Sequence, residues 1–69
     1  MKKTIKIEGM SCEHCAKKIE NALKNIDGIK SVKVHLKKKE AIISTDKLVS
    51  DETLKSTIEN LGYQITMIQ

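Results

Sequence analysis

The spacing of hydrophobic residues changes along the chain, and it predicts four strands. Polar and apolar residues alternate from Thr4 to Glu8, which is typical of a half-buried strand. Alternation returns from Ser31 to Leu36, and Ala41 to Thr45 is rich in strand-forming residues, so these two runs predict a hairpin. A last alternating run begins at Tyr63. The apolar positions expected on the core side of these runs are Ile5, Ile7, Val32, Val34, Leu36, Ile65 and Met67.

Two further stretches repeat their apolar residues every three or four positions, which predicts amphipathic helices. The first begins at about Glu13, with Ser11 as the expected N-cap, and ends before Gly28. The second begins at Ser50 as its N-cap and ends at Gly62, in the C′ position. The apolar stripes are Cys15 or Ala16, Ile19, Leu23 and Ile26 in the first helix, and Leu54, Ile58 and Leu61 in the second.

The predicted order is strand, helix, strand, strand, helix, strand, which is the α+β ferredoxin-like βαββαβ sandwich. We therefore expect a four-stranded antiparallel sheet with two helices on one face and water on the other. The chain has 69 residues, no proline and no linker, so we expect one domain over residues 1–69. A domain of this size has little room for an enclosed cavity, which places any site in a surface loop.

The net charge of +4 comes from lysine alone, because all thirteen basic residues are Lys. Nucleic-acid recognition favours arginine and stacked aromatic rings, whereas this chain has no arginine and one aromatic residue, Tyr63. The charge either steers a partner with an acidic face or only solvates the surface. We expect Lys17 and Lys18 to contact a partner and residues 37–39 to form a solvated turn.

The chain has no run of about 18 apolar residues, which predicts no insertion into a membrane. Lys2 and Lys3 resemble the start of a signal peptide, but charge returns at Lys6 and Glu8 before any apolar segment forms. We therefore expect a cytoplasmic protein, if the chain is the complete natural product.

Two cysteines, Cys12 and Cys15, lie where the first predicted strand leads into the first predicted helix. A helix N-terminus presents free N–H groups and a partial positive charge, and both favour thiolate over thiol. Structural zinc usually takes four ligands, whereas two thiolates fit the soft ion copper(I). A two-coordinate ion on an exposed loop can pass to a partner's cysteines through three-coordinate intermediates. The other donors considered are Met10, His14, His35 and the acidic residues.

Other interpretations of the cysteine pair are a disulfide or buried pair and a thioredoxin-like redox motif. The polar neighbours argue against the first, and the short chain argues against the second. We expect His14 to point outward, where it either tunes the charge and proton affinity of the loop or takes part when two molecules share metal, and His35 to be a surface strand residue. No acid, base or nucleophile accompanies the cysteines, so we expect no enzymatic activity.

The stretch Gly9 to Cys15, Gly-Met-Ser-Cys-Glu-His-Cys, resembles the metal-binding loop of heavy-metal-associated domains, and of bacterial copper chaperones most closely. The resemblance extends from Ile5 to Ile68 and includes Ile-Asp-Gly-Ile after the first helix and Leu-Gly-Tyr after the second. It implies that Cys12 and Cys15 bind copper(I) and that Met10 packs beneath the loop.

The resemblance also implies that Tyr63 lies near the metal. Ser11 stands where zinc- and lead-exporting relatives tend to carry an acid, which favours copper. The implied partners are the metal-binding domain of a copper-transporting P-type ATPase, a copper-responsive repressor, or a second copy in a copper-bridged homodimer.

Two other functions stay open at this point. One is the N-terminal metal-binding module of a copper ATPase, and the other is a mercury-binding scavenger. The start at Met1 and the end soon after the last strand favour a free-standing carrier, and the missing signal peptide disfavours an exported mercury carrier.

Overall fold

The computed structural model describes residues 1–69 and contains the six predicted elements in the predicted order, which confirms the ferredoxin-like fold class. Both helices are too short and too polar to cross a bilayer. The elements are β1 (Lys2–Glu8), α1 (Glu13–Lys24), β2 (Ile29–His35), β3 (Glu40–Thr45), α2 (Asp51–Asn60) and β4 (Gln64–Ile68).

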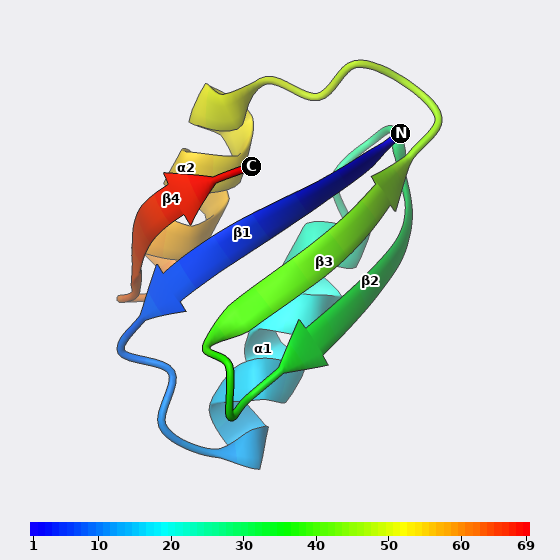
Figure 1. Cartoon of the computed structure of the whole chain (residues 1–69). Coiled ribbons are helices and arrows are strands. Elements are labelled where there is room, and N and C mark those ends of the chain that lie inside the picture. The colour runs from blue at the N-terminus through cyan, green and yellow to red at the C-terminus, as the bar shows by residue number, and fades with distance from the viewer.

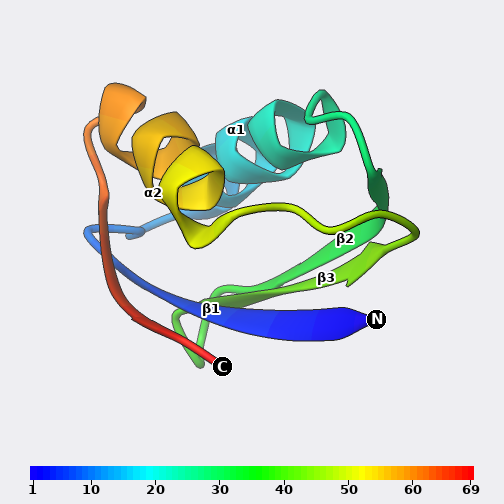
Figure 2. The ribbon, with the colours of Figure 1, turned by 90° about the horizontal axis from the view of Figure 1, so that it is seen from above.

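The four strands form one antiparallel sheet in the order β2-β3-β1-β4, so β3 and β1 are central and β2 and β4 are the edges (Figure 1). Viewed from above, α1 and α2 lie side by side over the same face of the sheet (Figure 2). The opposite face has no covering layer, as the alternation in the strands predicted.

A core of ten buried apolar side chains fills the space between the helices and the sheet. The alternation predicted for β1 is confirmed, because Ile5 and Ile7 both point into this core. The apolar stripes predicted for the helices are confirmed, because the buried residues are Ile19 and Leu23 in α1 and Leu54 and Ile58 in α2. The core residues are Ile5, Ile7, Met10, Ile19, Leu23, Ala41, Ile43, Val49, Leu54 and Ile58.

The two helices begin differently. The N-cap of α2 is Ser50, as predicted, and its hydroxyl accepts a hydrogen bond from the Thr53 N–H at 3.2 Å. The N-cap of α1 is Cys12, so the prediction of Ser11 is wrong. The backbone and the hydroxyl of Ser11 instead form hydrogen bonds with Cys15, one turn further along, and Ser11 is therefore not available to the helix amides.

The second helix ends in a turn that fixes the start of the next segment. Gly62 has φ +96°, and its N–H donates to the carbonyl of Glu59 at 2.9 Å, while the Tyr63 N–H donates to the carbonyl of Ile58 at 3.3 Å. These two bonds form a Schellman motif, in which a left-handed residue at C′ closes the helix. The predicted C′ glycine is therefore confirmed, and β4 begins one residue after Tyr63.

The predicted core position of Met67 is wrong, because this residue is 50% exposed. Lys6 of β1 pairs with Met67, but the next residue, Ile7, pairs with Ile65, which leaves Thr66 as an extra residue in β4. Such a bulge reverses the alternation of side chains beyond it. The two half-buried side chains of β4 are consequently Ile65 and Ile68.

Replacing Ile43, which lies fully buried in central strand β3, with alanine should destabilise the protein strongly. Truncating a buried isoleucine costs about 2–5 kcal/mol. A chain of this length has a free energy of unfolding of only about 3–10 kcal/mol. We expect urea unfolding of Ile43→Ala to begin at a much lower concentration than that of the parent. The matched control is Leu48→Ala at an 84% exposed position, which should stay within about 0.5 kcal/mol of the parent. Equal losses in both variants would contradict the assignment of the core.

Candidate metal centre

The two cysteines sit at the junction between β1 and α1, at one end of the sheet (Figure 1). Cys12 is the N-cap of α1 and is exposed, whereas Cys15 lies in the first turn of the helix and is half-buried. Both are free thiols, and their Sγ atoms lie 3.5 Å apart. Because a metal–thiolate bond measures about 2.3 Å, two sulfurs at this separation can reach a single ion.

Hydrogen bonds to Cys15 favour its thiolate form. The Tyr63 hydroxyl is the strongest contributor, followed by a backbone bond from Ser11 and a bond from the Cys12 thiol, and together they lower the pKa of Cys15 to about 6. Partial burial opposes this change but does not outweigh it. At neutral pH the sulfur of Cys15 is therefore mainly in the form that binds soft metals.

The hydrogen bond between Tyr63 and Cys15 also changes the pKa of the tyrosine. Its hydrogen bond to Cys15, together with partial burial and the nearby cysteine charges, raises the pKa of Tyr63. The two shifts agree, because a neutral hydroxyl donates to a thiolate and each group holds the other in that protonation state. The structure thus brings Tyr63, from the turn after α2, to the cysteines at the start of α1.

The remaining candidate donors do not complete a larger cluster. Met10 is buried in the core, with 4% exposed, as the resemblance implied for a residue that packs beneath the loop. His14 is exposed in the first turn of α1, and His35 is half-buried at the end of β2. Nowhere do three or more His, Cys, Asp or Glu side chains come together as a ligand set. The sulfur pair is thus the group of donors that the fold assembles.

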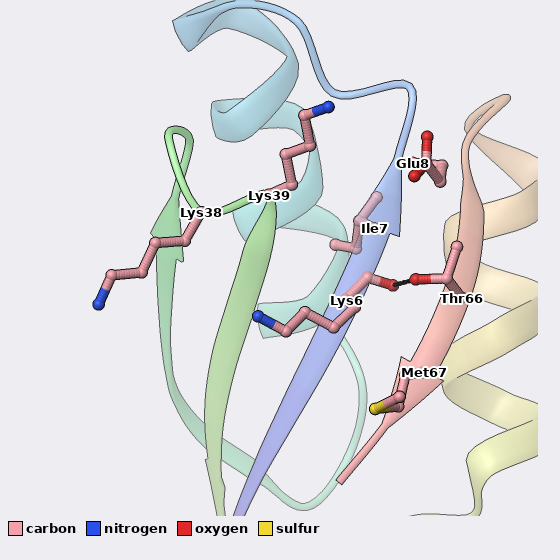
Figure 3. A pocket seen from close by; sticks show the side chains of 7 residues that line it. All are labelled: Lys6, Ile7, Glu8, Lys38, Lys39, Thr66 and Met67. Carbon is pink, nitrogen blue, oxygen red and sulfur yellow. Dashed lines mark hydrogen bonds between the residues drawn. The ribbon is translucent and has the colours of Figure 1, made fainter.

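The surface has two hollows, and the second of them borders the start of α1. One, of about 290 Å³, lies beside the bulge of β4 and is shown in Figure 3, where the ammonium groups of Lys38 and Lys39 point in different directions. The hydroxyl of Thr66 donates to the carbonyl of Lys6 at its edge, at 3.5 Å (Figure 3). A second hollow, of about 430 Å³, lies between the start of α1 and the end of β2. Neither is lined by a cysteine, so the sulfur pair is a surface site, as expected from the size of the chain.

Comparison with known proteins agrees with this arrangement. Residues 4–64 match the heavy-metal-associated domain family. The chain is 42% identical over 69 residues to the copper chaperone CopZ of Enterococcus hirae, covering 99% of this chain and all of that protein. It is 39% identical over 66 residues to a probable copper-exporting P-type ATPase of Archaeoglobus fulgidus, covering 94% of this chain and 8% of the ATPase.

Among solved structures, a CopZ metallochaperone superposes with a TM-score of 0.89 at 36% identity, covering 96% of this chain and all of the other. The family match spans nearly the whole chain, and the relatives share both the sequence and the fold. The chain therefore belongs to the heavy-metal-associated domain family.

Proposed function

We propose that this chain is a copper(I) carrier that binds its ion on Cys12 and Cys15 and hands it to a partner protein. The observation that carries the proposal is the pair of free sulfurs 3.5 Å apart at the start of a helix. The end-to-end similarity to a copper chaperone supports the choice of ion and the role of a single domain over residues 1–69. Soft thiolate donors select copper(I) over harder ions.

The transfer that we propose is an exchange of ligands with no change in oxidation state. A thiolate of the partner bonds to the ion at the exposed loop, and the ion becomes three-coordinate. One carrier thiolate then leaves, a second partner thiolate takes its place, and the other carrier thiolate is released. Each bond formed matches a bond broken, so the exchange needs no enzymatic step. The exposure of Cys12 supports this route, because a partner can approach it directly.

The metal-binding domain of a copper-transporting P-type ATPase is the partner that we propose, acting with the carrier in the cytoplasm. The similarity of this chain to part of a probable copper-exporting ATPase supports two like domains meeting at their metal loops. The same similarity favours a second candidate function, in which the chain is itself the metal-binding module of such an ATPase. A copper-responsive repressor and a copper-bridged homodimer are the other partners to be tested.

The first experiment is an anaerobic titration of the reduced protein with copper(I) against a competing chelator, in parallel with zinc(II). We expect one copper ion per chain, bound far more tightly than zinc. Copper bound no better than by a small dithiol, or preference for zinc, would contradict the proposed function while leaving the family assignment intact. Transfer to a free ATPase domain, rather than copper retention, would favour a carrier over a fixed module.

Replacing either Cys12 or Cys15 with serine should lower the copper(I) affinity by orders of magnitude, because one thiolate bond is lost. The fold should persist, since neither side chain belongs to the ten-residue core. The matched control is Met67→Leu, which removes a half-exposed sulfur from the open face of β4 and should leave the affinity unchanged. Equal affinity in a serine variant and in the parent would show that copper binds elsewhere.

Replacing Tyr63 with phenylalanine should raise the pKa of Cys15 above its value of about 6, because the largest stabilising contact of the thiolate is lost. The protonated thiol then persists to higher pH, and the pH at which Cys15 becomes half-reactive towards iodoacetamide moves upward. Site-resolved mass spectrometry of the metal-free protein measures this midpoint for Cys15 and Cys12 separately. An unchanged midpoint in Tyr63→Phe would contradict the hydrogen bond from the hydroxyl.

Charge reversal at Lys17, an exposed residue of α1 two positions after Cys15, should slow copper transfer to an acidic partner domain. Raising the ionic strength should slow transfer by the parent and affect Lys17→Glu less. Lys55→Glu, the same charge change on exposed α2, is the matched control and should transfer faster than Lys17→Glu. A rate that does not depend on salt, or equal losses in the two variants, would argue against steering by this face.

A further inference from the structure

We infer that the open face of the sheet is a docking surface for anionic membranes, on which lysines hold the protein against negatively charged lipid headgroups without inserting it. The open face is the side of the sheet that no helix covers (Figure 2). The inference goes beyond the proposed function. It concerns charges on the strands rather than the cysteines, so it can be tested without a metal.

The charges are divided unequally between the two layers of the molecule. Residues 2–8 and 29–45, which form β1, β2, β3 and the turn between β2 and β3, contain eight of the thirteen lysines and two acidic residues. The rest of the chain, which includes both helices, contains five lysines and seven acidic residues. A surface of negative charge therefore attracts the sheet layer and not the helix layer.

The alternation of side chains places two of these lysines on the open face. Ile5 of β1 and Ile43 of β3 are fully buried on the helix side of the sheet. Lys2 lies three positions before Ile5 in the same strand, and Lys33 pairs with Ile42, the neighbour of Ile43. Both lysines therefore point away from the core, and both are exposed.

The turn between β2 and β3 adds Lys38 and Lys39 to the open face. Their side chains line the hollow that Lys6 and Met67 also line, and their ammonium groups spread apart (Figure 3). None of the four lysines at positions 2, 33, 38 and 39 takes part in a salt bridge. Their charges are therefore free to interact with a partner.

The acidic residues of the open face offset little of this charge. Glu40 is already paired with Lys6, whose Nζ lies 2.6 Å from its carboxylate, so this pair is neutral as a whole. Glu8, at the edge of the hollow, is the remaining acid. The open face thus presents four free lysines against one free carboxylate.

The chemistry of this face favours lipid headgroups over a protein or a nucleic acid. Protein interfaces are enriched in aromatic residues, Met and Arg and depleted of Lys, and nucleic-acid sites use Arg and stacked rings. Among these residue types the face offers Met67 alone. Adsorption to anionic lipids needs only a sufficient number of positive charges near the membrane surface.

The spacing of the lysines also suits an extended partner. Lys2 pairs with Ser44 towards the end of β3, whereas Lys39 immediately precedes the start of β3. The basic residues therefore span the length of this six-residue strand, about 20 Å. A membrane surface can contact all of them at the same time.

Docking by the open face leaves the opposite layer free. The metal loop leads into α1, which covers the other face of the sheet (Figure 2). Lys17 on α1 thus stays turned towards the water. If the partner is a membrane transporter, as proposed above, docking concentrates the carrier in the layer of water where that partner works.

The first test is sedimentation of the reduced, metal-free protein with lipid vesicles at low salt. We expect binding to phosphatidylcholine vesicles that contain about 30% phosphatidylglycerol and none to pure phosphatidylcholine. Binding should be lost at about 1 M salt, where charges are screened beyond about 3 Å. Equal binding to the two vesicles, or no binding to either, would overturn the inference, and the second result would leave the face to an acidic protein.

The second test compares two double variants with the same net charge. Each lysine lost from a docking face should weaken binding about fivefold, so Lys33→Glu with Lys38→Glu should weaken it by about 25-fold or more. The matched control is Lys24→Glu with Lys55→Glu, at exposed positions on α1 and α2, which should lose far less. Equal losses would overturn the inference, because net charge rather than this face would then explain the binding.

Nuclear magnetic resonance of the parent gives the orientation without any substitution. In small anionic bicelles whose headgroups carry a nitroxide label, the amide signals of Lys33 and Lys38 should broaden more than those of Lys24 and Lys55. Stronger broadening of the helical residues would overturn the inference. Failure of the parent to bind copper(I) would overturn the proposed function and leave these results standing.

Discussion

The placement of the two cysteines depends on the burial of side chains at both ends of the connection between β1 and α1. Ile7 at the end of the strand and Ile19 in the helix are buried in the same core, and Met10 anchors the loop between them. The four residues from Gly9 to Cys12 therefore have little freedom, and the two sulfurs are brought together by packing rather than by an ion. A site arranged in advance loses little conformational entropy when it binds a ligand.

The two sulfurs are not equivalent, because the fold gives them different surroundings. Cys12 lies outside the first turn of α1 and is exposed, whereas Cys15 receives hydrogen bonds from Tyr63, Ser11 and Cys12. The sulfur of Cys12 is open to an incoming protein, whereas that of Cys15 is held in part by a contact from the opposite half of the chain. This combination suits an ion that must be held securely but remain within reach of a second pair of sulfurs.

Most of the architecture could be predicted from the sequence, because strand and helix periods are local properties. The errors arose where another contact outweighed a local preference. Ser11 is a favourable cap by residue type, but it bonds to Cys15. The alternation that predicted Met67 in the core is interrupted by the extra residue Thr66. The alternating pattern of the sequence contains no signal for this bulge. The contact between Tyr63 and Cys15 joins residues 48 positions apart in the sequence, so periodicity could not reveal it and only the family resemblance pointed to it.

The turn at the end of α2 has a consequence for how long Tyr63 stays beside Cys15. Helix ends open more often than helix centres, since fewer bonds hold them. The hydrogen bonds from Gly62 and Tyr63 hold this end closed, and the backbone of Tyr63 keeps its place only while they last. Each opening of the last turn would release the tyrosine from Cys15 for a moment. The lifetime of this single helical turn, at a distant point in the sequence, would thereby set how long the hydroxyl of Tyr63 stays beside Cys15.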